Sequence, residues 1–324
     1  MIQSFVPHLS NAVATTFMGL IAFFVIGISI LIALSIWKPR PFRRVLVRGL
    51  SWGPVYVFFM GGIMLGKVEM TVGCLFLSLR ALYELFALDQ RRFSRPVMML
   101  CALCTGVFYT ALMLYGWSVA TMALLVLCSA CIPYILVHYE GFTDFGTRLG
   151  RVLLYLGLST FCLGSLAALC WLPWEQAQVT LWSDALLLAV MTPQLSDCLQ
   201  YIMGKWLGKR VIYPNVSPSK TLEGALGGVF ITMLCTTPLA LAVLPFSWFQ
   251  SVALVLLLCV LGIAGDLFLS ALKREADIKD YPLLLPEFGG VLDRVDSLVL
   301  CAPFFLLFSY FHFFFWINTC LTSF

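Results

Sequence analysis

The sequence predicts an all-α polytopic membrane protein with about ten transmembrane helices and both termini on the non-cytoplasmic side. Hydrophobic residues make up 61% of the 324 residues, and the mean hydropathy of +0.97 lies far above that of water-soluble proteins. Apolar runs of roughly 18 residues or more, the length that crosses a bilayer as a helix, recur along the chain. Basic residues gather in alternate connections between these runs.

Ten apolar segments are expected to cross the membrane, at residues 16–37, 50–66, 68–88, 96–115, 117–137, 152–172, 179–202, 224–245, 249–272 and 297–317. The first is longer than the apolar part of a signal peptide and has no basic stretch before it, so we interpret it as a spanning helix. The third has the weakest signal for a span, because Arg80 and Glu84 lie in it. Their i, i+4 spacing favours an ion pair on one helix over a catalytic role.

The placement of the basic residues predicts the orientation of the helices. Every Lys and Arg except Lys67 and Arg80 lies in or beside five alternate connections, at about 38–48, 89–95, 148–151, 205–220 and 273–294. Cytoplasmic loops carry such an excess of Lys and Arg. These five connections are therefore expected on the cytoplasmic side.

The cysteines are interpreted as small apolar residues. Cys101 and Cys104, and Cys128 and Cys131, have a C-x-x-C spacing, but each pair lies inside an expected span with no His nearby. Neither a zinc site nor a redox motif is expected there. The net charge of +4 comes from the loops, and no nucleic-acid partner is expected.

One stretch, Gly265 to Asp296, concentrates charge in a chain that is only 11% charged. It contains polar residues suited to phosphate chemistry: Asp266, Ser270, Lys273, Arg274, Lys279, Asp280, Asp293, Arg294 and Asp296. Carboxylates can hold a divalent cation, and bases can neutralise the phosphate oxygens that the cation does not reach. The stretch follows one apolar run and precedes another, so this chemistry is expected at a membrane surface.

Helical spacing predicts which of these side chains lie together. Asp266 and Ser270 are expected to share one helix face, with Lys273 one turn further on. Asp293 and Asp296 can likewise face one way. A surface ion-pair cluster is the alternative; it suits Glu275 and Asp277, but not Asp266, which lies in an apolar run and requires a cation as partner.

Two polar segments upstream are further candidates. Asp197 lies near the cytoplasmic end of its span, where an acid is either functional or already in water. Ser217 and Pro218 predict a helix start, with Ser217 as the cap and Pro218 at the first helical position. Lys220 and Thr221 would then lie at the helix N-terminus, where backbone amides favour an anion. Ser217, Lys220 and Thr221 can form a phosphate cradle; capping alone is the alternative.

The stretch SALKREADIKDYPLLLPEFGGVLDRVDS resembles the signature of the phosphatidate cytidylyltransferase (CDP-diacylglycerol synthase) family, which has Ser, Lys-Arg, Lys-Asp, Pro, His-Gly-Gly and Asp-Arg-x-x-Asp or a close variant. The matching residues are Ser270, Lys273, Arg274, Lys279, Asp280, Pro286, Gly289, Gly290, Asp293, Arg294 and Asp296. Upstream, DCLQYIMGKWLGK resembles the family's Asp-x-x-Ala-Tyr-x-x-Gly segment, and SPSKTLEGALGG resembles its SPxKTxEGxxGG segment. Three positions depart from the family: Phe288 replaces its His, Glu287 the preceding Gly and Gln200 the Ala.

The resemblance implies transfer of a cytidylyl group from CTP to phosphatidate, giving CDP-diacylglycerol and pyrophosphate at the cytoplasmic face. It implies Mg²⁺ held by Asp266 and Asp293 with Asp296 nearby, and leaves a second cation such as K⁺ open. It gives catalytic roles to Asp266, Lys273, Arg274, Lys279, Asp280, Asp293, Arg294 and Asp296. It gives substrate-binding roles to Asp197, Tyr201, Ser217, Lys220, Thr221, Glu223 and Ser270.

Three parts of the chain are expected: an extra N-terminal transmembrane helix with a basic cytoplasmic loop (1–48), N-terminal membrane helices (49–178) and a catalytic membrane domain (179–324). The expected location is a bacterial inner membrane, with membrane lipids as partners and a homodimer left open. Three alternatives remain. The chain is a relative that acts on another lipid phosphate, a catalytically weakened partner protein, or a lipid or ion transporter with Asp197 and Asp266 as coupling sites.

Overall fold

A computed structural model describes residues 53–89, 93–172, 181–214, 216–278, 281 and 290–322, with the backbone alone for Leu181 and 313–322. The expected span 16–37 and loop 38–48 lie outside these residues. So do Lys279, Asp280, Glu287 and Phe288.

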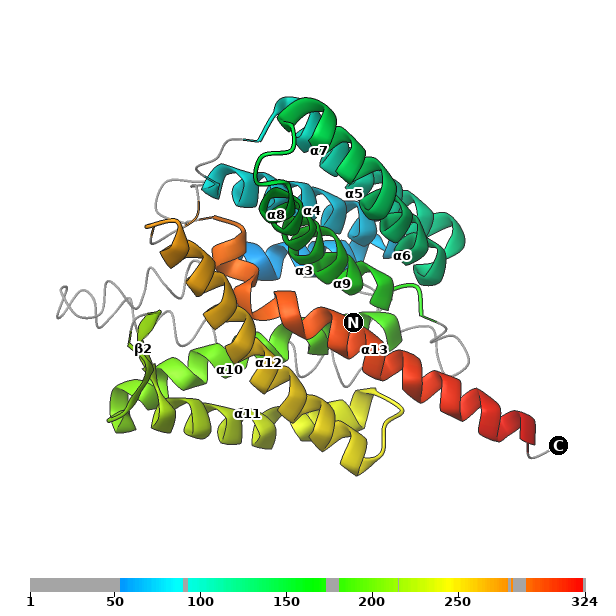
Figure 1. Cartoon of the computed structure of the whole chain (residues 1–324). Coiled ribbons are helices and arrows are strands. Elements are labelled where there is room, and N and C mark those ends of the chain that lie inside the picture. Colours follow the sequence, from blue (N-terminus) through cyan, green and yellow to red (C-terminus); the bar gives the residue numbers. More distant parts are fainter. Residues whose placement is uncertain are drawn as a thin grey trace.

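The described residues are almost entirely helical (Figure 1). The first group comprises α3 (Gly53–Leu65), α4 (Lys67–Leu88), α5 (Arg95–Tyr115), α6 (Trp117–Val126), α7 (Ile132–Glu140), α8 (Phe145–Leu156) and α9 (Leu163–Leu169). Two short π-helical segments, η2 (Leu127–Cys131) and η3 (Gly157–Cys162), join α6 to α7 and α8 to α9 into continuous rods. The second group comprises α10 (Leu181–Leu207), α11 (Leu222–Val243), α12 (Trp248–Glu275) and α13 (Leu292–Thr322).

Seven helical segments in the described part of the chain are long and apolar enough to cross a membrane. They are α4, α5, α6 to α7, α8 to α9, α11, α12 and α13. The all-α polytopic membrane class is therefore confirmed, whereas the count of ten and the side of the termini stay predictions. α3 has only 13 residues, and α10 carries polar side chains such as Asp184 and Gln194 that are buried against the protein.

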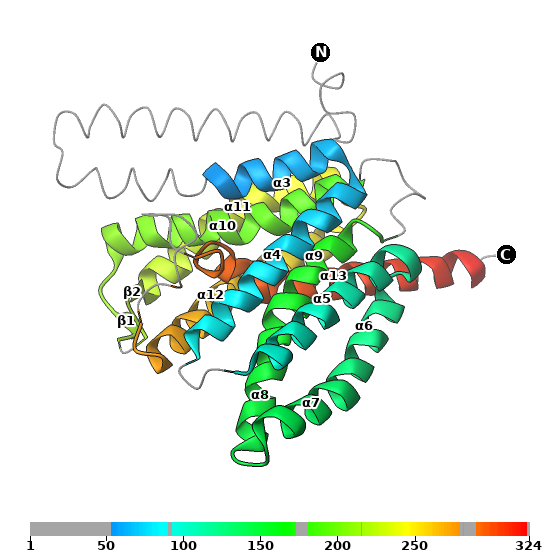
Figure 2. The same cartoon turned by 90° about the horizontal axis from the view of Figure 1, so that it is seen from above.

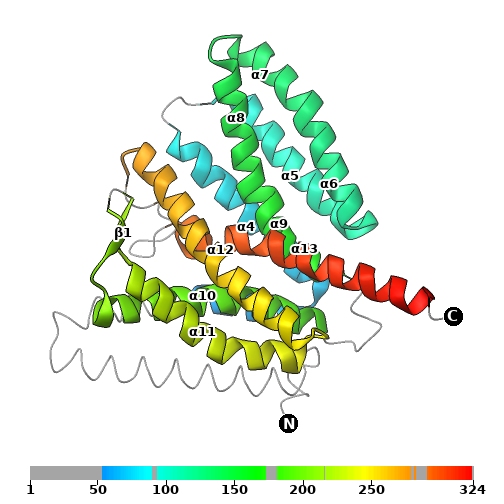
Figure 3. The ribbon, with the colours of Figure 1, turned by 60° about the horizontal axis from the view of Figure 1, so that its bottom comes forward.

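α13 lies between two sets of helices (Figures 1 and 3). It packs against α10 and α12 on one side and against α9 and η3 on the other. α4 packs against α3, α5 and α9, and Figure 2 shows it running obliquely across the molecule. The first turn of α13 is thus close to helices from both halves of the sequence.

Glycine permits the close approach of α10 and α11. A Cβ added at Gly228 of α11 would lie 2.5 Å from the backbone nitrogen and 2.6 Å from the Cα of Gln200 on α10. Backbone atoms cannot move aside as the end of a flexible side chain can. Small residues at helix contacts are what allow such packing in membranes.

Gly228→Ala is therefore expected to destabilise the protein by about 1–3 kcal/mol, the usual cost of an overpacked contact. Thermal unfolding of the purified protein in detergent measures the effect. Gly106→Ala on α5 is the control, because an added Cβ there meets no atom within 4 Å. Equal unfolding temperatures for the two variants would contradict this account of the α10–α11 contact.

Candidate active site

A β-hairpin between α10 and α11 carries Lys220 to two carboxylates. β1 (Val211–Tyr213) pairs antiparallel with β2 (Ser217–Thr221). The Lys220 Nζ lies 2.5 Å from Asp266 Oδ2 and 4.0 Å from Asp197 Oδ1. The side chain of Lys220 is only 14% exposed, so its charge is directed into the protein.

The expected helix start at Ser217 is wrong. Ser217 pairs with Tyr213 in the hairpin, and the helix begins at Leu222 with Thr221 as its cap; the Thr221 hydroxyl accepts a hydrogen bond from Gly224 N at 3.2 Å. Pro218 lies in a strand, which its fixed φ permits. Lys220 therefore precedes the helix, and its side chain reaches the carboxylates from the hairpin.

Asp266 of α12 and Asp296 of α13 form a carboxylate pair. Their carboxyl groups are close enough to interact electrostatically. The Ser270 hydroxyl donates to Asp266 Oδ1 at 3.3 Å, and Ser297 N donates to Asp296 Oδ1 at 2.7 Å. Two carboxylates so close together require a cation or a shared proton, and Lys220 is the cation in contact with Asp266.

Asp293 has a different set of partners, although it lies only one turn before Asp296. Lys273 Nζ donates to its Oδ1 at 2.8 Å, while Tyr281 N and Gly290 N donate to its Oδ2 at 2.9 and 3.2 Å. The buried Tyr281 ring also lies 5.4 Å from Lys273 Nζ. Burial, with the nearby Asp293 carboxylate, raises the pKa of the Tyr281 hydroxyl. Tyr281 thus keeps its proton and joins the end of α12 to the start of α13.

Several other candidates have contacts that stabilise the local structure. Glu223 Oε2 accepts hydrogen bonds from Lys209 N and Arg210 N at 2.9 and 3.1 Å, which holds the base of the hairpin. Arg274 is exposed and donates to the carbonyl oxygen of Ile278. The Arg294 carbonyl accepts from Gln194 at 3.2 Å, and Lys205 lies over the Tyr201 ring. Their roles with substrates stay predictions.

The fit to a divalent cation can be judged from these partners. Within the described residues, no group of three or more His, Cys, Asp or Glu is arranged to hold a metal ion. Mg²⁺ in phosphate-transferring sites is commonly held by one or two carboxylates, together with waters and substrate phosphates. The Asp266–Asp296 pair fits this pattern. Asp293, with three donors already on its oxygens, would have to give up part of its contacts to act as the expected ligand.

Comparison with known proteins places this site in a family. A model of the cytidylyltransferase family matches residues 46–312. The chain belongs to the cytidylyltransferase family. It is also similar over shorter stretches to curated relatives: 38% identical over 151 residues to the uncharacterised protein YnbB of Escherichia coli, 45% over 110 residues to the phosphatidate cytidylyltransferase of Bacillus subtilis, and 38% over 122 residues to that of Aquifex aeolicus. The match covers 47% of this chain and 50% of the Escherichia coli protein, 34% and 41% for the Bacillus protein, and 38% and 46% for the Aquifex protein. The chain therefore spans about half the length of these relatives.

In this member of the cytidylyltransferase family, α4 contributes a carboxylate that the sequence did not connect to the site. The expected Arg80–Glu84 ion pair is confirmed, with Arg80 Nε 3.1 Å from Glu84 Oε1. Glu84 also accepts hydrogen bonds from Val291 N and Leu292 N, at the start of α13. The i, i+4 spacing revealed the first contact; no sequence signal links Glu84 to amides 207 and 208 positions away.

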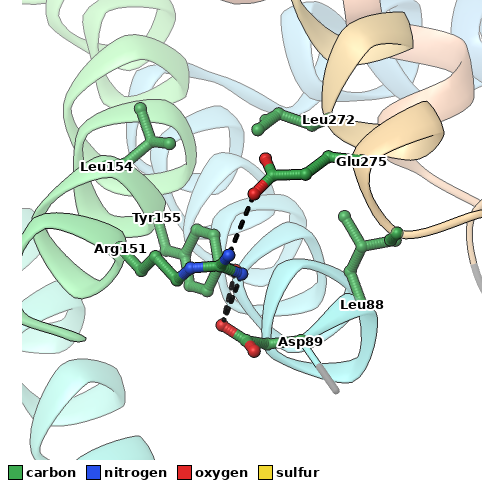
Figure 4. Close-up of a pocket in the computed structure, with 8 residues that line it drawn as sticks. Leu88, Asp89, Arg151, Leu154, Tyr155, Leu272 and Glu275 are labelled. Carbon is green, nitrogen blue, oxygen red and sulfur yellow. Dashed lines mark hydrogen bonds and ion pairs between the residues drawn. The ribbon is translucent and has the colours of Figure 1, made fainter. Parts of the chain in front are cut away.

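An arginine bridge joins α8 to the ends of α4 and α12 (Figure 4). Arg151 donates to Asp89 Oδ2 at 3.1 Å and to Glu275 Oε1 at 2.9 Å, and the Tyr155 hydroxyl donates to the same Asp89 oxygen at 3.1 Å. These residues line a cavity of about 210 Å³ between α4, α8 and α12. The ion-pair interpretation of Glu275 is confirmed: Arg151 of α8 contacts this residue at the end of α12.

Proposed function

We propose that this chain transfers a cytidylyl group from CTP to phosphatidate at the cytoplasmic membrane face, releasing CDP-diacylglycerol and pyrophosphate. The observation that carries the proposal is that Lys220 pairs with both Asp266 and Asp197, and that Asp296 interacts with Asp266 beside it. Family membership supports cytidylyl transfer, and the names of the Bacillus and Aquifex relatives support phosphatidate as the acceptor.

In the proposed reaction, an oxygen of the lipid phosphate attacks the α-phosphorus of CTP, and the bond from that phosphorus to the pyrophosphate oxygen breaks. The protein supplies no covalent nucleophile, because the lipid brings its own. Lys220 and Lys273 are positioned to neutralise phosphate oxygens, while Asp266 and Asp296 would hold Mg²⁺. Bound there, Mg²⁺ would stabilise the negative charge that develops on pyrophosphate as it leaves.

Each lysine has a carboxylate partner before substrate binds. Lys220 contacts Asp266, and Lys273 contacts Asp293. A cation bound by Asp266 and Asp296 would replace the positive charge that Lys220 now places beside Asp266. Lys220 is then available to the triphosphate, so binding of metal and of nucleotide would reinforce each other.

Removal of divalent cations is expected to abolish transfer. The assay uses purified protein in detergent with CTP labelled at the α-phosphate, phosphatidate and Mg²⁺; labelled CDP-diacylglycerol should form, disappear with EDTA and return with excess Mg²⁺. Product formation that persists in EDTA would contradict the metal role. Bound CTP without product would indicate another lipid phosphate as the acceptor, and no binding of CTP would overturn the proposed function.

A further inference from the structure

Glu84 is a fully buried carboxylate in a membrane-spanning helix, outside the stretch that carries the family's motifs. Its side chain is 0% exposed. Oε1 accepts a hydrogen bond from Val291 N at 2.8 Å, and Oε2 accepts one from Leu292 N at 2.9 Å. Both oxygens are thus directed at the first amides of α13.

A carboxylate suits this place for two physical reasons. The first amides of a helix have no partner within the helix, and the helix dipole favours a negative charge beside them. Charge-assisted hydrogen bonds are also roughly twice as strong as neutral ones. A charge buried in a membrane protein is costly without such partners, so packing alone would be served better by an apolar residue.

The amides held by Glu84 directly precede Asp293. Gly290, one residue before Val291, donates to Asp293 Oδ2. A Cβ added at Gly290 would lie 2.7 Å from Glu84 Oε2 and 2.5 Å from the Cβ of Tyr281. Glu84, the turn at Gly290 and Tyr281 therefore form one tightly packed unit around Asp293, and Asp293 in turn fixes Lys273.

We propose that Glu84 is a positioning residue for the reaction: it fixes the turn 290–292, and through this turn the orientation of Asp293 and Lys273. This inference rests on the proposed function, because it assigns Glu84 to the same site. A residue of α4, in the N-terminal group of helices, would then hold in place the segment that carries Asp293. Loss of the contact lets the turn move while the helices stay in place.

The test compares Glu84→Gln with Glu140→Gln. Glu140 is a matched control, because it is also a buried glutamate that accepts from the backbone amide before a helix, Ser94 N at 2.8 Å, and pairs with an arginine, Arg148. It lies at the end of α7, away from the catalytic residues. Each variant is measured for amide exchange without substrates, thermal unfolding, kcat, and the Mg²⁺ concentration that gives half of the maximal rate.

In Glu84→Gln, the amide hydrogens of Val291 and Leu292 should exchange faster with solvent. The kcat should fall by about 10²-fold, because small misplacements of reacting groups have effects of this size. The Mg²⁺ concentration that gives half of the maximal rate should rise. Glu140→Gln should lose similar thermal stability but keep the wild-type kcat and Mg²⁺ requirement. Gly290→Ala disturbs the same contact from the other side, and it should reproduce the Glu84→Gln kinetics if that variant folds poorly.

Two results would overturn the inference: unchanged exchange at Val291 and Leu292 in Glu84→Gln, or an unchanged kcat and Mg²⁺ requirement in Glu84→Gln and Gly290→Ala. A purely structural Glu84 would lower thermal stability in both Gln variants and leave kcat per folded molecule unchanged. A wild-type protein that transfers no cytidylyl group would count against the proposed function alone, since exchange is measured without substrates and still decides whether Glu84 holds the turn.

Discussion

Asp266→Asn is expected to abolish cytidylyl transfer and leave the protein folded. Asparagine keeps the size of the side chain and an oxygen that can accept from the Ser270 hydroxyl, but it removes one of the two charges that would hold Mg²⁺. Metal stabilisation of a phosphoryl transition state contributes several kcal/mol. Since about 1.4 kcal/mol corresponds to a tenfold change in rate, a loss of ~10³-fold or more is expected.

The initial rate of CDP-diacylglycerol formation per folded molecule measures this loss. Glu275→Gln is the control on the same helix: Glu275 is exposed and paired with Arg151, a kind of ion pair that contributes about 0–1 kcal/mol, so the wild-type rate should remain. Asp293→Asn extends the test to the ligand that the family resemblance implies. Wild-type rates in both Asp266→Asn and Asp293→Asn would refute the metal assignment.

Lys220→Met is expected to lower kcat/KM for CTP by about 10²-fold. Methionine keeps the apolar length of lysine but removes the charge between Asp197 and Asp266. Hydrogen bonds to charged groups contribute about 1.5–3 kcal/mol, and the loss of one to the triphosphate accounts for the expected change. The carboxylates also lose the cation beside them, so the change acts on both partners of the site.

Two comparisons separate the roles of Lys220. Lys209→Met removes an exposed charge just before the same hairpin but keeps the amide that donates to Glu223, and it should retain the wild-type kcat/KM. Saturating Mg²⁺ should not restore the kcat/KM of Lys220→Met, because a cation bound to the carboxylates does not replace the contact between Lys220 and CTP. Full recovery at high Mg²⁺ would show that Lys220 serves the carboxylates alone.

The membrane helices could be predicted because their signal is local. Long apolar runs gave the positions of α4, α5, α11 and α12 within a few residues. Helix ends that depend on distant partners were predicted less accurately. α8 begins at Phe145, in a stretch where the sequence indicated a loop. Its two arginines are accommodated there because Arg148 pairs with Glu140 and Arg151 pairs with Asp89. α13 begins at Leu292, five residues before the expected 297, since Glu84 caps it from another helix.

The candidate site could be predicted as a set of residues, but its grouping could not. Spacing placed Ser270 on the same face as Asp266, and the two side chains are hydrogen-bonded. The same reasoning placed Asp293 and Asp296 on one helix face, whereas in the structure Asp296 interacts with Asp266 and Asp293 pairs with Lys273. This division depends on how α12 and α13 pack against each other. The spacing of residues along a single helix gives no information about that packing.

The contact between Glu84 and α13 also bears on the order in which the chain is made. Val291 follows Glu84 by 207 positions, and the N-terminal part of a protein is synthesised and folds first. Glu84 therefore enters the bilayer long before its amide partners exist. Arg80, one helical turn earlier in the same helix, is present from the start and can neutralise the acid during this interval. The Arg80–Glu84 pair thus allows α4 to enter the membrane before its partner helix is made, and the later arrival of α13 completes the site.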